Sequence, residues 1–527
     1  MSLRNHLVLC VALASLAALA ACGSGSGAVN PNPPPNGSFG DSNLNGTYVF
    51  TASGVDTDSD PYAMVGTFTA NGTGGISGGT VDINDPGFST ELVPNSTFSS
   101  GSYTIGVDGR GRITLSTSTP FGSIVLDCVL QDSSHGLVTQ FDNNAAGSGT
   151  IDAQTAGVTP AGTYAFEFSG ADLGTGATYA TVGNFTISSG SIAGLEDFSD
   201  GGFAYPNQSL AGTVVLGPSS TPGTTLATSF RSTVYDVFAI DASHLKFIEM
   251  DTAGSLVGDA YSQTSASIPA ETLAFTLSGS YPSGDTNSAA GGFIVTDGNG
   301  NVTSSSTADA NNNGSVTSAP VSFSGTYTAA GTGRYTLALN SFTDGTGYVA
   351  YPSSGGLFLL EIDNDGTMSG AGYVQSSMTF GALGYALNLS GVNTTDGVAV
   401  GDIAEFTATS SGTLSGAIDE NFDPGGTPNY GMALSGSYSA PDSNGRGQLG
   451  ATAGTSSNTT LNGGFDLTFY SVDGTSFPFI ETDANGQISS GIFVAQNAGS
   501  SAASAAKTHL FVPQAVVRSR AALKKKK

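Results

Sequence analysis

The chain has 527 residues, with 75 Gly, 21 Pro and no Trp, and its 14 Lys and Arg stand against 41 Asp and Glu for a formal net charge of −27. A negative field of this size repels phosphate backbones, which argues against nucleic-acid binding. Domains typically hold about 100 to 200 residues, so the length predicts several domains rather than one large core. Only 10% of the residues are charged. The abundant Gly, Ser and Thr are typical of short strands and tight turns, which predicts an all-β protein.

The first 21 residues are typical of a signal peptide. Arg4 precedes an apolar run, residues 7–21, that is shorter than the roughly 20 residues a spanning helix needs. The run leads into Ala20-Ala21-Cys22-Gly23, which resembles the lipobox of bacterial lipoproteins. The resemblance implies that Cys22 is acylated, with palmitate as a typical chain, and that Gly23 directs sorting to the outer membrane. We therefore expect a protein lipid-anchored in the cell envelope, on the periplasmic or the surface face.

Four copies of one unit follow a tether. Residues 22–41 hold the lipidated cysteine and a Gly/Ser/Pro-rich linker. Comparing the chain with itself then gives a period near 110 residues. The expected boundaries are 1–21 for the signal peptide, 42–156, 157–266, 267–377 and 378–497 for the four copies, and 498–527 for a basic tail.

Three features recur in each copy. An opening strand with alternating apolar residues, such as Tyr164-Ala165-Phe166, precedes a strand with an aromatic residue. We align this aromatic as Phe68, Phe185, Phe293 and Phe406. A Glu-x-Asp pattern comes near the end of each copy, beginning at Gln140, Glu249, Glu361 and Glu481.

Each copy is predicted to fold as an antiparallel up-and-down β-barrel of about eight strands. Asp-Gly and Asn-Gly pairs indicate several hairpins, and short turns join nearly all of the predicted strands apart from one longer connection midway in each copy. Such a meander removes its edges by closing on itself. A two-sheet sandwich is the alternative, but it normally needs longer crossing connections. In strand count and size the copies resemble lipocalin and avidin barrels, without the signature motifs of either family. The whole chain resembles uncharacterised tandem-repeat surface lipoproteins, which implies no activity.

The Glu-x-Asp column supplies the candidate ligand-binding residues Gln140, Glu249, Glu361 and Glu481. Facing into a barrel, these side chains could orient a ligand. Facing outward, they could pair with arginines and solubilise the strand. The arginines available for that alternative are Arg112, Arg334 and Arg446.

Other chemistry-bearing residues favour structural interpretations. His135 and His244 occupy equivalent places, either as ligands or proton carriers at a barrel rim or, as we favour, in polar turns. Cys128, left unpaired in the mature chain, is interpreted as a small buried hydrophobe.

The sequence predicts neither an enzyme nor a metal or other cofactor. Residues 75–79 match a nucleophile elbow but fall in a hairpin, where that motif does not work. Asp56, Asp58 and Asp60 alternate as in an EF-hand loop, yet Pro61 stands where the loop requires Gly. The Asp-Gly-Asn-Gly run at 297–300 is what a hairpin turn demands.

We therefore expect a non-enzymatic surface-displayed binding module, with a structural or adhesive spacer without a small-molecule ligand as the alternative. The expected membrane partner is reached through the lipid on Cys22. The tail holds seven of the 14 basic residues, from Lys507 to Lys527, and no acid, so it either contacts an anionic surface or has no role.

Overall fold

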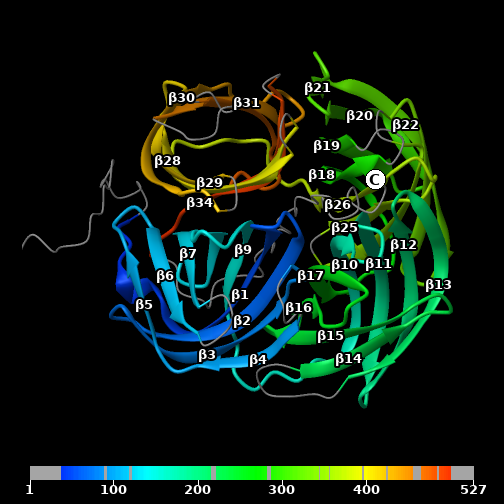
Figure 1. The fold of residues 1–527 in the computed structure, drawn as a ribbon. Helices are drawn as coiled ribbons and strands as arrows, with labels where there is room; N and C mark the ends of the chain where they lie inside the picture. The colour runs from blue at the N-terminus through cyan, green and yellow to red at the C-terminus, as the bar shows by residue number, and fades with distance from the viewer. Residues whose placement is uncertain are drawn as a thin grey trace, which may run out of the picture.

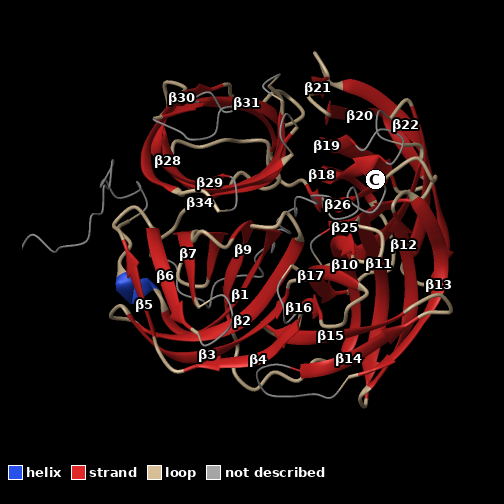
Figure 2. Ribbon diagram, in the orientation of Figure 1, coloured by secondary structure: helices blue, strands red, loops and turns tan. Residues whose placement is uncertain are grey.

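The computed structural model describes residues 37–87, 92–117, 122–214, 221–281, 286–342, 345–354, 356–394, 397–422, 425–454, 464–483 and 486–499. Cys22 and the basic tail lie outside the described residues. The described chain is almost entirely strand, with one short 3-10 helix, η1 (Asp41–Asn43), before the first strand (Figure 2). The all-β prediction and the four eight-stranded barrels are confirmed.

The first barrel contains one extra strand, β4, which pairs only with β3. The other eight strands close a ring, because β3 also pairs with β2 and β5 and β9 returns to β1. Its strands are β1 (Asn45–Asp56), β2 (Pro61–Asn71), β3 (Gly75–Asn84), β4 (Leu92–Phe98), β5 (Gly101–Ile105), β6 (Arg110–Ser116), β7 (Ser123–Leu130), β8 (His135–Gln140) and β9 (Ala145–Ala153).

The second barrel is closed by the pairing of its first strand with its last. Its strands are β10 (Gly162–Asp172), β11 (Ala177–Ser188), β12 (Ser191–Asp200), β13 (Phe203–Thr213), β14 (Thr221–Ala227), β15 (Ser232–Ala239), β16 (His244–Glu249) and β17 (Gly254–Ser262).

The third barrel repeats the plan of the first, with β21 as the extra strand on β20. Its strands are β18 (Ala270–Tyr281), β19 (Thr286–Asp297), β20 (Asn301–Asn312), β21 (Ser315–Val316), β22 (Val321–Gly331), β23 (Arg334–Asn340), β24 (Gly347–Ser353), β25 (Gly356–Glu361) and β26 (Thr367–Val374).

The fourth barrel again closes first strand on last. Its strands are β27 (Gly384–Asn393), β28 (Val398–Ala408), β29 (Thr413–Phe422), β30 (Asn429–Tyr438), β31 (Arg446–Ala453), β32 (Gly464–Tyr470), β33 (Ser476–Glu481) and β34 (Gln487–Ala495). Consecutive strands pair with each other and the first strand pairs with the last. Each copy is therefore a barrel and not the alternative two-sheet sandwich.

Aromatic pairs in the first two strands of a barrel fix their register. Tyr48 lies opposite Phe68, with ring centroids 5.5 Å apart, and the second and fourth barrels repeat the pair. In the third barrel our alignment was wrong by one residue. Ile294 occupies this place opposite Leu273, whereas Phe293 points outward and packs against Tyr470 of the fourth barrel. A shift of one residue along a strand exchanges its two faces.

The four barrels form a closed ring (Figure 1). In the figure the first barrel lies below the fourth, and the second and third complete the ring on the other side. One hydrophobic cluster takes residues from all four barrels, among them Leu137, Val182, Phe358 and Ile403. A second cluster joins the first barrel to the second through Val49, Val65 and Phe238, among others. Each barrel therefore buries outward-facing apolar side chains against both neighbours. Within the described residues no helix is long and apolar enough to span a membrane.

Candidate functional site

The Glu-x-Asp column points into the barrels. Gln140, Glu249, Glu361 and Glu481 are the last residues of β8, β16, β25 and β33, and all four are fully buried. They share the face of core residues such as Leu245 and Phe247. Burial with a nearby aspartate raises the pKa of Glu481 to about 8, and burial raises that of Glu249 to about 8 although Arg231 opposes the shift. Burial therefore disfavours the charged form of both carboxyls.

Three side chains of this column form hydrogen bonds within their own barrels. Glu249 accepts a hydrogen bond from Arg231 at 2.5 Å, and Gln140 donates one to Asp142 at 2.9 Å. Glu481 accepts one from Gln487 at 3.0 Å and another from Ser489. The proposed outward pairs with arginines are not formed, because Arg112, Arg334 and Arg446 hold Asp127, Asp197 and Asp309.

The Asp of the Glu-x-Asp pattern has one role in all four copies. Its carboxylate accepts the backbone N–H of a residue near the start of β7, β15, β24 or β32, such as Val234 for Asp251 at 2.8 Å. The other acceptors are Asp142, Asp363 and Asp483. The Asp thus holds the start of a barrel strand in place. This structural role explains why the pattern recurs, and no ligand is needed to account for it.

Aromatic side chains fill the barrel interiors. In the second barrel Phe168 lies 4.7 Å from Phe166 and 4.8 Å from Phe247, between ring centroids. In the fourth barrel Phe493 lies 4.9 Å from Phe477 and 5.2 Å from Phe469. Phe323 and Phe342 lie 4.9 Å apart in the third, and the first buries Phe50 and Phe68. The space in which a lipocalin-like barrel would hold a ligand is occupied by the protein itself.

A column of glutamines, not recognised in the sequence, joins each barrel to the next. Each side-chain amide donates to a backbone carbonyl at the end of β7, β15, β24 or β32 of the following barrel, and the fourth barrel returns to the first. The pairs are Gln154 to Ala239 (2.8 Å), Gln263 to Pro352 (2.8 Å), Gln375 to Ser471 (2.9 Å) and Gln496 to Leu130 (3.0 Å).

An Asp-x-Asn pattern on the third strand makes a second cyclic contact. Asn84, Asn311 and Asn421 donate to the backbone carbonyls of Glu249, Glu481 and Gln140 at 2.8, 3.0 and 2.6 Å. Ser199 takes this place in the second barrel and bonds Thr367 of the third at 2.8 Å. The backbone carbonyls of three residues of the Glu-x-Asp column are therefore hydrogen-bonded by the neighbouring barrel.

The aspartate of the Asp-x-Asn pattern forms a salt bridge with an arginine at three of the four interfaces between barrels. Arg334 binds Asp197 at 2.5 Å, Arg446 binds Asp309 at 2.8 Å, and Arg110 binds Asp419 at 2.9 Å. All three aspartates are buried. The remaining member, Asp82 between the first and second barrels, has no salt bridge among the described residues.

The two histidines lie at the start of β8 and β16, where each ring bonds an aspartate side chain rather than lying in a simple polar turn. His135 bonds Asp152 at 2.6 Å and His244 bonds Asp259 at 2.5 Å. Lys246 lies 2.9 Å from Asp259 and 3.6 Å from Asp152, across the interface of the first two barrels. Although burial opposes it, Lys246 and His244 lower the pKa of Asp259 to about 2.

The calcium-like motifs are turns. Asp56 Oδ1 accepts the backbone N–H groups of Asp58 and Asp60, at 2.9 and 2.8 Å, and Asp297 holds Asn299 and Asn301 in the same way. Within the described part of the chain, no group of three or more His, Cys, Asp or Glu is placed to hold a metal ion. Cys128 is fully buried, as interpreted from the sequence.

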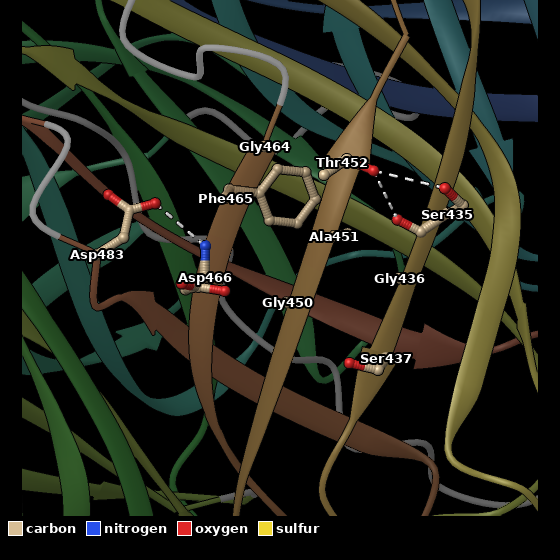
Figure 3. A pocket seen from close by; sticks show the side chains of 10 residues that line it. All are labelled: Ser435, Gly436, Ser437, Gly450, Ala451, Thr452, Gly464, Phe465, Asp466 and Asp483. Atoms are coloured by element: carbon tan, nitrogen blue, oxygen red, sulfur yellow. Dashed lines mark hydrogen bonds between the residues drawn. The ribbon is translucent and has the colours of Figure 1, made fainter.

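Two exposed features lie on the barrel exteriors. A groove of about 560 Å³ follows β30, β31 and β32, with Ser435, Thr452 and Asp466 along it (Figure 3). On the second barrel Phe230, 62% exposed, lies 5.2 Å from Tyr205, which stacks on Phe198 at 4.6 Å between ring centroids. Neither feature brings together an acid, a base and a nucleophile.

The described chain thus belongs to the class of closed all-β barrels, four of them filled and joined in a ring. No protein-family model and no curated protein matches it. Two solved structures of transferrin binding protein B share 10% identity and a TM-score of 0.19. One is a Trp-176-Ala mutant from Haemophilus parasuis Hp5, covering 69% of this chain and 83% of that one. The other is the intact protein with N and C lobes, "Ap-TbpB", covering 86% and 95%. A likeness this distant carries no argument about function.

Proposed function

We propose that the chain is a non-enzymatic cell-envelope lipoprotein whose body serves as a rigid structural spacer at the cell surface. The observation that carries this proposal is that the barrel interiors are filled by the protein's own aromatic side chains. The contacts that join each barrel to two neighbours support rigidity. A small-molecule binding function would instead require an open, apolar-lined interior.

The spacer proposal is tested by native mass spectrometry of the protein extracted from its own membrane. The expected mass is that of the acylated polypeptide with bound ions alone, before and after denaturation. A stoichiometric organic molecule that is released only on unfolding would overturn the spacer function and favour a ligand inside a barrel.

Anchoring through Cys22 is the second part of the proposal. Two or more acyl chains hold a protein stably at a bilayer, and the linker of residues 23–41 would hold the body away from the outer membrane. The variant Cys22→Ser is expected to move from the membrane fraction to the soluble fraction. Cys128→Ser is the matched control, because Cys128 is buried in the first barrel, and it should stay with the membrane. Equal partitioning of both variants would contradict the anchor.

The basic tail is proposed to contact anionic lipid. Seven cations contribute about 1 kcal/mol each near such a surface, within a Debye length. Lipid-free protein should bind anionic vesicles at low salt and be released at high salt. Equal binding by a chain truncated after residue 506 would reject this role.

A binding module that works through its outer surface is the second candidate, favoured by the exposed Phe230 and the half-buried Tyr205 beside it. An exposed aromatic patch marks an interaction site on many proteins. Because the body between signal and tail carries 6 basic and 41 acidic residues, the fitting partner is a basic protein surface. Beads coated with lipid-free protein should adhere to intact cells more than beads coated with the Phe230→Ser variant. Equal adhesion would remove this candidate.

A further inference from the structure

At one of the four interfaces, the third-strand aspartate meets a carboxyl group instead of an arginine. At the other three, Asp197, Asp309 and Asp419 each bind an arginine of the adjacent barrel. Each of those arginines is the first residue of its strand, β23, β31 or β6. The equivalent strand of the second barrel, β14, begins with Thr221, and the sequence from residue 201 to residue 230 contains neither Lys nor Arg. The interface between the first and second barrels therefore lacks the arginine that pairs with this column elsewhere.

Asp82 of β3 and Asp236 of β15 face each other across this interface. Their carboxyl groups are hydrogen-bonded to each other. Asp82 Oδ1 also accepts the backbone N–H of Asn95, and Asp236 Oδ1 accepts that of Gly223 at 2.7 Å. Both residues are buried, with 0% and 3% of their surface exposed. Two ionised carboxylates have no donor between them, so this hydrogen bond requires one shared proton.

The other titratable groups of the elements packed here have partners of their own. Tyr62 of β2 and Tyr235 of β15 lie in the barrel cores. Asp251, after β16, accepts the backbone N–H of Val234. Within the described residues the remaining groups bond one another: Lys246 with Asp152 and Asp259, His135 with Asp152, His244 with Asp259, Arg231 with Glu249, and Asp85 with Asp56. No salt bridge among them reaches the Asp82–Asp236 pair, so this pair depends on its own proton.

The shared proton is held up to neutral pH. Burial and the neighbouring Asp236 raise the pKa of Asp82 to about 7, and burial raises the pKa of Asp236 as well. Once the barrels separate, each carboxyl regains the ordinary Asp pKa of about 3.9. The closed interface therefore keeps a proton that the open interface releases. Its stabilising contribution is full below about pH 4 and is lost as the pH rises through about 7.

We propose that this shared proton makes the interface between the first and second barrels pH-sensitive, so that the two barrels are held together at acidic pH and separate more readily as the pH rises. Once the proton is lost, two buried carboxylates repel each other with no cation between them. The interface between the third and fourth barrels is the comparison, because Arg446 holds both oxygens of Asp309 at 2.8 and 2.9 Å and a guanidinium group stays charged.

The test measures how fast a buried thiol at each of these two interfaces reacts with a thiol reagent. Val65 lies in the hydrophobic cluster between the first and second barrels, and Val392 lies beside residues of the third barrel. Val65→Cys and Val392→Cys are made separately in the mature Cys22→Ser chain, whose remaining Cys128 is fully buried. Each rate, from pH 5 to pH 8.5, is divided by the rate of the same thiol in the urea-unfolded chain at the same pH. This ratio removes the titration of the thiol itself.

The corrected rate for Val65→Cys is expected to rise at least about tenfold between pH 5 and pH 7 and to level off above about pH 8, since one proton changes the opening equilibrium about tenfold per pH unit. The rate for Val392→Cys should stay within about threefold over the same range. Adding Asp236→Asn to Val65→Cys should abolish the rise. The amide carbonyl keeps the bond from Gly223, and the amide N–H donates to Asp82 without a shared proton.

The matched control is His244→Gln, because His244 lies at the same interface but bonds Asp259 instead of the pair. The rise with pH should persist in that variant. The proposal is overturned if the thiol between the first and second barrels responds to pH no more than the thiol between the third and fourth. It is equally overturned if Asp82→Asn and Asp236→Asn both keep the rise, which would assign the pH dependence to another group.

Discussion

At the scale of single residues, the pKa values of buried carboxyl groups are shifted in opposite directions in different parts of the barrels. Burial and the nearby Asp483 raise the pKa of Glu481 to about 8, and its hydrogen-bond partners Gln487 and Ser489 carry no charge. Asp259 is equally enclosed but lies against Lys246 and His244, and its pKa falls to about 2. Burial disfavours charge in both cases, and the neighbouring cations decide the direction.

These shifts predict that stability falls as the pH rises. An unfolded Glu has a pKa of about 4.3, so the folded chain holds extra protons at Glu249 and Glu481 between about pH 4 and pH 8. Their contribution is full below about pH 4 and is lost as the pH rises through about 8. The lowered pKa of Asp259 contributes stability of the opposite pH dependence, which is lost only as the pH falls from about 4 through about 2.

The urea midpoint should therefore decline between pH 5 and pH 9. Glu481→Gln should raise the midpoint at pH 9 relative to the parent chain and change it little at pH 5. Asp365→Asn, at an exposed position, is the control and should show no such pH dependence. A parent midpoint that rises toward pH 9 would contradict this assignment.

The glutamine column gives a second residue-scale prediction. Gln496 donates to the backbone carbonyls of both Asp108 and Leu130 of the first barrel. Gln496→Ala leaves these two buried acceptors without the amide, which costs about 1–3 kcal/mol of the free energy of unfolding. Gln448→Ala, on the exposed face of β31, should cost less than about 0.5 kcal/mol. Equal losses in urea unfolding would show that the contact between barrels contributes nothing.

At the scale of elements, the sequence correctly predicted the strands and hairpins, because local residue patterns determine them. The barrel prediction is confirmed. It could be made because strands and hairpins depend on patterns only a few residues long, such as the alternation in Tyr164-Ala165-Phe166 and the Asn-Gly and Asp-Gly turns. The error at Phe293 arose because two adjacent apolar residues, Phe293 and Ile294, both fit the aligned column. Only the opposing strand shows which of them faces inward.

The contacts between barrels were not predicted, although their residues recur visibly. Gln154, Gln263, Gln375 and Gln496 stand at the end of each copy, and an Asp-x-Asn or Asp-x-Ser pattern stands on each third strand. Their partners lie in the next barrel, most of them at backbone carbonyls, which leave no trace in the sequence. The structure also shows why Glu-x-Asp recurs, since its Asp fastens a strand.

The arginine–aspartate pairs support an element-scale prediction. Arg334 binds both oxygens of Asp197, and Tyr351 bonds the same carboxylate. Arg334→Ala leaves a buried charge unpaired and should cost about 3–5 kcal/mol of the free energy of unfolding. The double variant Arg334→Ala, Asp197→Asn should recover part of that loss, because it removes the charge as well. A single variant within about 1 kcal/mol of the parent chain would contradict the pairing.

At the scale of the whole molecule, the barrels are filled units that each touch two neighbours. The hydrophobic cluster at the centre of the ring contains residues of every barrel. The glutamine contacts run from each barrel to the next, and the last of them joins the fourth barrel to the first. A chain of four independent barrels on short linkers would not need this last interface.

Ring closure is the central claim, and a disulfide across the last interface tests it most directly. Thr139 of β8 donates to the Gly401 carbonyl at 3.2 Å, and a Cβ added at Gly401 would lie 2.9 Å from the Thr139 hydroxyl oxygen. The pair Thr139→Cys and Gly401→Cys, in the mature Cys22→Ser chain, should therefore oxidise within one molecule, because disulfides form where Cβ atoms are close. Thr139→Cys with Ser435→Cys, on the outer face of the fourth barrel, should not. A folded chain in which the Thr139–Gly401 pair stays reduced under the same conditions would contradict a closed ring.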